Sequence, residues 1–137
     1  MAAIRSKNTK PELIVRRGLH ARGFRFRLHD RTIPGSPDIV LPKRGALIDV
    51  RSCFFHGHDC ALFKIPAQRR DFWIRKIDTN RARDLRNISL QLELGWRTAI
   101  VWECSLRGRN QLGEDLAIDT LSHWLLSDTM FTEVRGT

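Results

Sequence analysis

A crowded run of cysteines and histidines is the feature that most restricts how this chain can fold. Residues 53–60 read Cys-Phe-Phe-His-Gly-His-Asp-Cys, and a third cysteine follows much later in the chain. Zinc in proteins takes four tetrahedral ligands from cysteine and histidine side chains. The sequence therefore predicts a closed structural zinc site that ties an irregular loop to the end of a later strand, with the ligands Cys53, His58, Cys60 and Cys104.

His56 is the second imidazole of this run, and the spacing leaves its role open. It is either an alternative fourth ligand or a free side chain for proton transfer, because an unperturbed imidazole has a pKa of about 6.5. The competing interpretation is three reduced core thiols beside solvent-exposed histidines. We favour the zinc site, because it uses every cysteine in the chain and because a cytosolic protein keeps its thiols reduced.

Length and charge narrow the class of protein. The chain has 137 residues, which is typical of a single domain, here 1–137. A chain this short buries a modest share of its surface, so a structural metal would help it fold. Lysine and arginine number 24 against 15 acidic residues, a formal net charge of +9. Such an excess attracts polyanions, and nucleic acid is the commonest of these.

Membrane association is the competing interpretation of the positive charge. The basic residues are spread along the chain rather than gathered in a polybasic tail, and no run of about 18 apolar residues is present. Residues 1–10 also lack the apolar stretch of a secretory signal. We therefore expect no membrane partner and a cytoplasmic location.

Local patterns predict a mixed α/β domain in which a small sheet is flanked by helices. Thr9 and Glu12 form a capping box for a first helix that ends near Gly23. The other predicted elements are a half-buried strand at 24–28, a hairpin of strands 38–41 and 46–50, a long helix at 71–94, a strand at 96–102 and a helix through 116–125. The long helix should bury an apolar stripe of Ile74, Ile77, Leu85, Ile88 and Leu92.

Two aspartates lie at the ends of the predicted hairpin strands. Asp38 follows a proline, and about ten residues later comes Asp49-Val50-Arg51, close to the nuclease signature Pro-Asp, acid-x-Lys. Phosphodiester hydrolysis needs a hard cation, and Mg²⁺ takes oxygen ligands from one or two carboxylates, with backbone carbonyls completing the set. Arg51 would then steady the developing negative charge. The alternative is that Asp38 is a turn residue and that Asp49 and Arg51 form a cross-strand ion pair.

Several other side chains have two interpretations on the sequence alone. Phe54 and Phe55 either pack against the loop, which we prefer at this point, or form a wedge between DNA base pairs. Asp84 either pairs with neighbouring arginines or orients a histidine, and Glu12 either caps the first helix or reaches an active site. The long helix carries a basic face for solvent or phosphate contact, made by Arg69, Arg70, Arg75, Lys76, Arg81, Arg83 and Arg86.

Short motifs that together specify a family extend from about Ile4 to Arg109. They are Arg5-Ser6-Lys7-Asn8, 33–38 (Ile-Pro-Gly-Ser-Pro-Asp), 53–60, 63–64 (Phe-Lys), 72–73 (Phe-Trp), 76–77 (Lys-Ile), 80–84, 94–97 and 101–104 (Val-Trp-Glu-Cys). With these motifs the chain resembles the very short patch repair endonuclease family of bacteria. The resemblance implies a restriction-endonuclease-like fold with a structural zinc. It also implies Mg²⁺-dependent nicking of double-stranded DNA on the 5′ side of the thymine in a T·G mismatch, which arises when 5-methylcytosine deaminates.

The resemblance further implies roles for individual residues. Asp38 matches the metal-binding aspartate, and Glu12 matches an acid near the metal-bound waters. His56 matches the catalytic histidine, with Asp84 in support. The predicted zinc ligands match those of the family. The two adjacent phenylalanines match an aromatic wedge at the mismatch, which reverses our preference for plain packing.

The strand before the zinc loop departs from the family pattern. Val50 replaces threonine or a similar residue whose backbone carbonyl can bind metal, a role that valine can retain. Arg51 stands where the family has histidine or aspartate, Ser52 replaces a glycine, and Asp49 replaces an apolar residue. These changes either restore the general nuclease pattern or impair activity. The N-terminal arm is also short, so we expect either weaker DNA binding or a natural protein with a longer arm.

Three functions stay open at this stage. We favour a mismatch-directed nicking endonuclease. The alternatives are a related site-specific nuclease that cuts paired duplex, and a zinc-stabilised module that binds mismatched DNA without cutting it. The family also implies mismatch-repair proteins as partners, and we expect a monomer associated with the bacterial nucleoid.

Overall fold

A five-stranded sheet organises residues 8–137, the part of the chain that the computed structural model describes. The Arg5-Ser6-Lys7 motif and the N-terminal arm lie outside the described residues. The elements are α1 Lys10–Ala21, β1 Arg27–Leu28, β2 Ile39–Leu41, β3 Ala46–Arg51, α2 Arg70–Glu93, β4 Arg97–Trp102, α3 Glu114–Leu125 and β5 Phe131–Val134. Short 3-10 turns follow β2 (Pro42–Arg44) and β4 (Glu103–Ser105). The prediction of a mixed α/β chain is confirmed.

The strands lie side by side in the order in which they occur in the chain. β1, β2 and β3 pair antiparallel, whereas β3, β4 and β5 pair parallel. The predicted hairpin is present, with Ile39 opposite Ile48 and with Gly45 in a left-handed conformation (φ 58°) at the turn. A parallel neighbour needs a long crossover connection, and α2 supplies it between β3 and β4.

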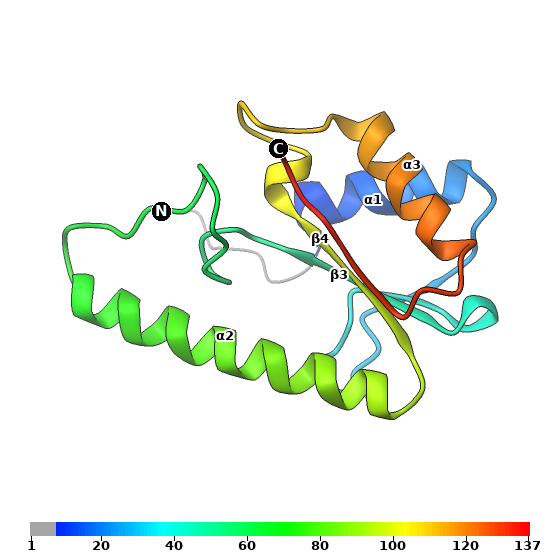
Figure 1. Ribbon diagram of the computed structural model, residues 1–137, viewed down its shortest axis with the longest axis horizontal. Helices are drawn as coiled ribbons and strands as arrows, with labels where there is room; N and C mark the ends of the chain where they lie inside the picture. Colours follow the sequence, from blue (N-terminus) through cyan, green and yellow to red (C-terminus); the bar gives the residue numbers. More distant parts are fainter. Residues whose placement is uncertain (1–7) are drawn as a thin grey trace.

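Helices α1 and α3 cover one face of the sheet, and α2 lies on the other (Figure 1). Successive residues of a strand point to opposite faces. Ile48 and Val101 belong to the core cluster under α1 and α3. Their neighbours Leu47 and Ile100 belong to clusters on the opposite face, where α2 lies. Asp49, two residues beyond Leu47 on β3, therefore also faces α2.

The structure corrects three expectations about these elements. The strand expected at 24–28 is hydrogen-bonded only at Arg27–Leu28. Strand β5 is not predicted by the sequence. On α2, Leu85 is 68% exposed, and three of the four buried residues are polar, namely Asn80, Asp84 and Gln91. This helix faces loops that offer backbone hydrogen-bonding groups, so polar side chains rather than leucine turn inward.

Candidate active site and metal centre

The acidic pair lies where β2 begins and β3 ends, on the face covered by α2. Continuing the register of Ile39 with Ile48 sets Asp38 opposite Asp49. The backbone N–H of Val50 donates to Oδ2 of Asp38 at 2.8 Å. The hairpin thus brings the two carboxylates to one edge of the sheet.

Burial and mutual repulsion oppose two negative charges at this pair. Burial, together with the charge of Asp49, raises the pKa of Asp38 to about 8. Burial also raises the pKa of Asp49, although the charges of Arg51 and His56 oppose that rise. Carboxylates that are destabilised in this way gain strongly from a nearby cation.

Arg51 is nearly buried beside the acidic pair, with 7% of its surface exposed. Its Nη2 lies 3.4 Å from Oδ2 of Asp49, and its guanidinium lies over the ring of Trp102. The ion pair therefore forms along β3, between residues two apart, and not across strands as the alternative interpretation requires. Nε of Arg51 has no hydrogen-bond partner among residues 8–137, which leaves one buried donor for a further anion.

His56 and Asp84 form a hydrogen-bonded pair beside these groups. Nδ1 of His56 lies 2.7 Å from Oδ2 of Asp84, so Nε2 is the nitrogen left for other partners. Burial acts to raise the pKa of Asp84, but the hydrogen bond with His56 and the charges of Arg51, His56 and Arg83 outweigh it, and the pKa is lowered. An ionised carboxylate at Nδ1 fixes the orientation of an imidazole. The geometry matches the interpretation in which Asp84 orients a histidine.

Helix α2 holds the loop that carries His56. Nδ2 of Asn80 donates to the carbonyl of Phe55 at 2.9 Å, and Nε of Arg81 donates to the carbonyl of Gly57 at 3.0 Å. Gly57 has a φ of 60°, and a Cβ there would collide with the Arg81 side chain. Arg81 is therefore an anchor of the loop rather than a free member of the predicted basic face.

An open cavity of about 460 Å³ unites these groups. Its walls come from the turn before β2, the end of β3, the 53–60 loop and α2. The lining residues are Gly35, Ser36, Asp38, Asp49, Val50, Arg51, His56, Arg83, Asp84 and Asn87. Acids, an oriented imidazole and two arginines share one concave surface, an arrangement suited to phosphate-ester chemistry.

Glu12 approaches Asp38 from α1. Thr9 caps this helix by accepting the N–H of Glu12 at 3.3 Å, but the Glu12 carboxylate turns inward and the residue is 1% exposed. Its Oε2 lies 3.0 Å from Nε2 of His29, and the N–H of His29 donates to the Asp38 carbonyl. One ligand atom from each of Glu12, His29 and Asp38 lies within 4.8 Å of the other two. Sequence reasoning misses His29, because its position depends on a left-handed backbone (φ 50°) that no local pattern predicts.

The four predicted zinc ligands converge at the end of β4. Their ligand atoms lie within 4.8 Å of one another. Nδ1 of His58 is 3.6 Å from Sγ of Cys53 and 3.5 Å from Sγ of Cys104. Zn–S bonds of about 2.3 Å and Zn–N bonds of about 2.0–2.1 Å separate tetrahedral ligand atoms by roughly 3.5–3.8 Å. The residues therefore fit a zinc ion, and the imidazole among them belongs to His58 rather than His56.

Burial shifts the pKa values of three of these ligands. Burial raises the pKa of the Cys53 and Cys104 thiols. Burial, helped by the charge of Arg135, lowers the pKa of His58 and so favours the neutral imidazole that binds metal. Buried thiols ionise readily only when a cation compensates, so the cluster has the properties of a metal centre.

Phe54 and Phe55 belong to a half-buried aromatic cluster near the start of α2. Their rings meet edge to face with centroids 4.9 Å apart. Phe54 also lies 5.2 Å from Trp73 and 6.3 Å from Phe63, between ring centroids. Both phenylalanines remain partly exposed. Trp73, which the sequence singles out only within a motif, therefore belongs to the same aromatic cluster as the two phenylalanines.

Known proteins resemble this chain along most of its length. A family model described as DNA mismatch endonuclease Vsr matches residues 1–62. DNA mismatch endonuclease Vsr of Escherichia coli (strain K12) is 42% identical over 128 residues, which cover 93% of this chain and 82% of that protein. Type II nicking enzyme V.XorIIP of Xanthomonas oryzae pv. oryzae is 50% identical over 106 residues, 77% of this chain and 78% of that protein. Type II nicking enzyme V.NmeAIP of Neisseria meningitidis is 41% identical over 109 residues, with coverage of 80% and 78%.

Proposed function

This chain belongs to the DNA mismatch endonuclease Vsr family and is a DNA endonuclease, and on that premise we propose that it nicks duplex DNA at a T·G mismatch. The cut falls on the 5′ side of the thymine, requires Mg²⁺, and initiates repair after 5-methylcytosine deamination. The observation that carries the proposal is one cavity in which Asp38 and Asp49 lie together with the His56–Asp84 pair.

The cation site rests on oxygen atoms at the end of the hairpin. Asp38 would hold Mg²⁺ with its carboxylate, Val50 with its backbone carbonyl, and Asp49 with a second carboxylate. Glu12 would contact the metal-bound waters. A bound Mg²⁺ supplies charge neutralisation at the phosphate and lowers the pKa of a bound water. Because burial and the charge of Asp49 raise the pKa of Asp38 to about 8, binding of a cation by this carboxylate near neutral pH would release a proton.

Two side chains of the cavity act on the reacting phosphate. His56, with Nδ1 held by Asp84, exchanges a proton through Nε2 with the attacking water or with the leaving oxygen. Arg51 places a buried positive charge, with one unused N–H, beside the group on which negative charge develops. This assignment gives the departures at 49 and 51 a role in catalysis.

The remaining parts of the chain position the DNA. Three cysteines and His58 would hold Zn²⁺, which would fasten the 53–60 loop to the end of β4. Phe54 and Phe55 form the wedge, and the deformability of a mismatched duplex lowers the cost of opening the stack. We assign residues 1–137 to one monomeric endonuclease domain with the restriction-endonuclease-like fold. Within residues 8–137, no helix has both the length and the apolar composition needed to cross a bilayer.

Matched duplexes test this proposal against its alternatives. One labelled sequence is prepared with a T·G and with a T·A pair at the same position, and nicking is followed with and without Mg²⁺. We expect the T·G duplex to be cleaved much faster than the T·A duplex, at one bond 5′ of the thymine, and only with Mg²⁺. Equal cleavage of both duplexes would instead favour the site-specific nuclease. Salt-sensitive binding of the T·G duplex without any nicking would favour the binding module.

Removing the two wedge side chains should lower the preference for a T·G over a T·A duplex, whereas the zinc content of the protein should change less. In a Phe54→Ala, Phe55→Ala double variant, we expect the ratio of kcat/KM for T·G over T·A duplex to fall about tenfold or more, because stacking on a base contributes roughly 1–3 kcal/mol. Leu85→Ala, which removes an exposed apolar side chain from α2, is the control and should leave the ratio unchanged. An unchanged ratio in the double variant would show that these rings pack against the loop and do not act as a wedge.

Without Mg²⁺, the folded chain should lose stability as the pH rises toward 8. The pKa of Asp38 is about 8 in the folded state against an ordinary 3.8, so between these values the folded state holds a proton that the unfolded chain has released. A group with a raised folded pKa stabilises the fold below its unfolded pKa, and this contribution is lost as pH rises through the folded pKa. Urea unfolding across this range, with zinc retained, should show the decline. Asp38→Asn should flatten it.

A further inference from the structure

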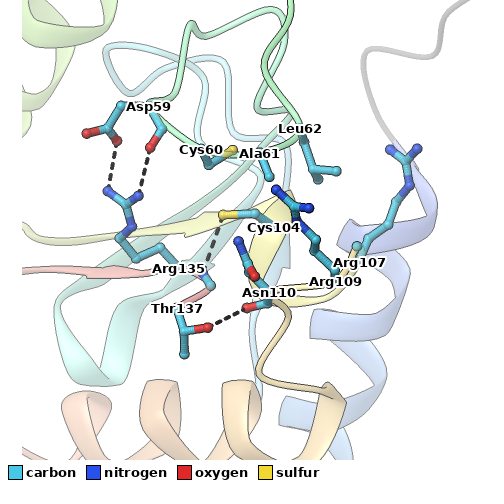
Figure 2. A pocket seen from close by; sticks show the side chains of 12 residues that line it. Asp59, Cys60, Ala61, Leu62, Cys104, Arg107, Arg109, Asn110, Arg135 and Thr137 are labelled. Carbon is cyan, nitrogen blue, oxygen red and sulfur yellow. Dashed lines mark hydrogen bonds and ion pairs between the residues drawn. The ribbon is translucent and has the colours of Figure 1, made fainter.

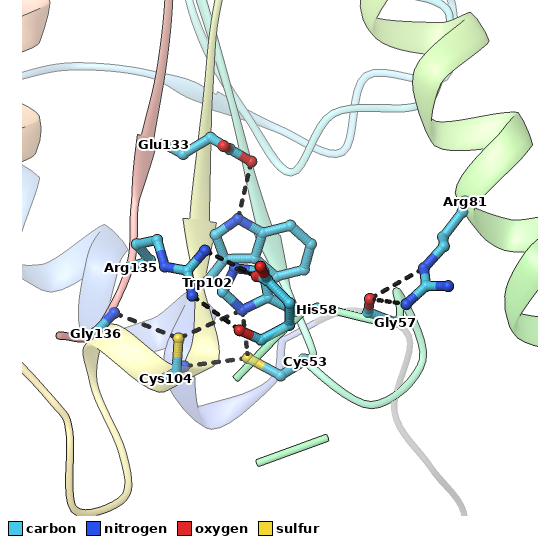
Figure 3. Close-up of polar contacts among 10 residues, drawn as sticks. Cys53, Gly57, His58, Arg81, Trp102, Cys104, Glu133, Arg135 and Gly136 are labelled. Atoms are coloured by element: carbon cyan, nitrogen blue, oxygen red, sulfur yellow. Dashed lines mark hydrogen bonds and ion pairs between the residues drawn. The ribbon is translucent and has the colours of Figure 1, made fainter. Parts of the chain in front are cut away.

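The end of β5 supports the imidazole ligand of the zinc site. β5 pairs in parallel with β4, the strand that leads to Cys104. Glu133 accepts a hydrogen bond from Nε1 of Trp102 at 3.1 Å. The Trp102 ring stacks on His58, with centroids 3.9 Å apart and planes 8° from parallel (Figure 3). Glu133 thereby fixes the surface against which the imidazole lies.

Arg135 fastens the loop between two of the ligands. Its Nη1 donates to Oδ1 of Asp59 at 2.9 Å, and its Nη2 donates to the backbone carbonyl of the same residue at 3.0 Å (Figure 2). Asp59 stands between His58 and Cys60 in the chain, so a shift of its backbone moves both ligands. One planar guanidinium therefore restrains a side chain and the main chain together.

Gly136 supports a thiol ligand directly. Its N–H donates to Sγ of Cys104 at 3.3 Å. A Cβ at this position would lie 2.5 Å from the carbonyl oxygen of Asn110 and 2.6 Å from that of Cys104. A larger residue would therefore displace the backbone at position 136 from the thiol. The N–H of Thr137 donates to the same Asn110 carbonyl at 2.8 Å. Residues 136 and 137 are thus held by the Cys104 thiol and by the Asn110 carbonyl.

The same residues lie beside a cavity at the cluster. A cavity of about 190 Å³ is lined by Cys60 and Cys104 together with Arg135, Gly136 and Thr137 (Figure 2). Cys104 itself is only 3% exposed, so Gly136 contacts a thiol that is almost fully buried.

We propose that residues 133–137 form a latch that keeps the zinc ion bound by positioning its ligands. The proposal rests on the zinc site assigned under the proposed function. Groups that orient metal ligands contribute roughly 10- to 100-fold to metal affinity. Arg135 and Gly136 are positioning residues of this kind, so losing either should speed zinc release without altering the ligand set.

Zinc release from the full chain tests the latch. Arg135→Met keeps the apolar stem of the side chain and removes both hydrogen bonds to Asp59, whereas Gly136→Ala adds the colliding methyl group. We expect each zinc-loaded variant to transfer zinc to a chromogenic chelator about tenfold faster than the unsubstituted chain. Arg75→Met, which changes an exposed arginine of α2, is the control and should release zinc at the unsubstituted rate.

A double-mutant cycle identifies the contact responsible. Asp59→Ala removes only the side-chain bond and keeps the backbone carbonyl that Arg135 also binds, so it should speed release, but less than Arg135→Met does. Combining the two should add little to the effect of Arg135→Met, because that variant already removes both bonds. If the unsubstituted chain holds zinc but Arg135→Met and Gly136→Ala release it no faster, the latch is wrong and the zinc site stands. If elemental analysis finds no zinc in the unsubstituted chain, the latch and the zinc site are both wrong. Arg135→Met requires no backbone change, so it decides the matter even if Gly136→Ala fails to fold.

Discussion

Alanine in place of Asp38 is expected to lower the rate of nicking about a thousandfold or more, because a catalytic metal contributes several kcal/mol and about 1.4 kcal/mol is a factor of ten. The chain should stay folded. Losing the acceptor for the Val50 N–H costs about 1–3 kcal/mol, but the substitution also removes a buried carboxylate that Asp49 repels. Single-turnover nicking of a T·G duplex over a range of Mg²⁺ concentrations measures the effect.

Two further variants separate metal binding from general loss of charge. Asp38→Asn keeps a hydrogen-bond acceptor for Val50 but lacks a full charge for the cation, so it should be nearly as inactive as the alanine variant. Asp128→Ala, which removes an exposed aspartate far along the chain, should nick normally. If Asp38→Ala nicks at the normal rate and with the normal Mg²⁺ requirement, Asp38 is not part of the catalytic centre.

Serine in place of Cys104 is expected to release zinc and to unfold a large share of the protein. A structural zinc contributes its binding energy directly to folding, and a domain of this size is stable by only about 5–15 kcal/mol. The 53–60 loop is irregular, and its attachment to β4 depends on this cluster. Elemental analysis should find less than one zinc per chain, and thermal unfolding should begin well below that of the unsubstituted protein.

The two histidines of the loop provide the matched comparison. His58→Ala should behave like Cys104→Ser, because Nδ1 of His58 lies 3.5 Å from Sγ of Cys104. His56→Ala should retain zinc and thermal stability but lose most nicking, because its Nδ1 is bound to Asp84. The opposite pattern, with zinc lost from the His56 variant alone, would make His56 the fourth ligand and remove it from catalysis.

Local periodicity was sufficient to predict the main elements of the fold. The hairpin follows from two short apolar strands around Pro42–Arg44, and α2 follows from its length and helical pattern. Which face of α2 is buried does not follow, because Asn80, Asp84 and Gln91 turn inward to meet loop groups that are distant in sequence. Strand β5 could not be predicted either, because its four residues form a strand only through pairing with β4.

The chemistry of the site follows a similar division. Cys53, His58, Cys60 and Cys104 could be grouped from the sequence because thiols are few and zinc demands a fixed set of ligands. His29 could not be connected with Glu12, because their contact depends on how α1 packs and on an unusual backbone conformation. The support that Gly136 gives to Cys104 is also beyond prediction, because a backbone N–H has no signature in a sequence.

The inward side of α2 has a consequence for how this enzyme can change. Asn80, Arg81 and Asp84 lie within about one helical turn of each other, and they hold the carbonyls of Phe55 and Gly57 and the imidazole of His56. Under the proposed function, one helix therefore positions both the wedge that meets a distorted base pair and the imidazole that transfers a proton. A mutation that rotates or slides this helix would then alter both steps at once, so substrate choice and the rate of cutting would change together.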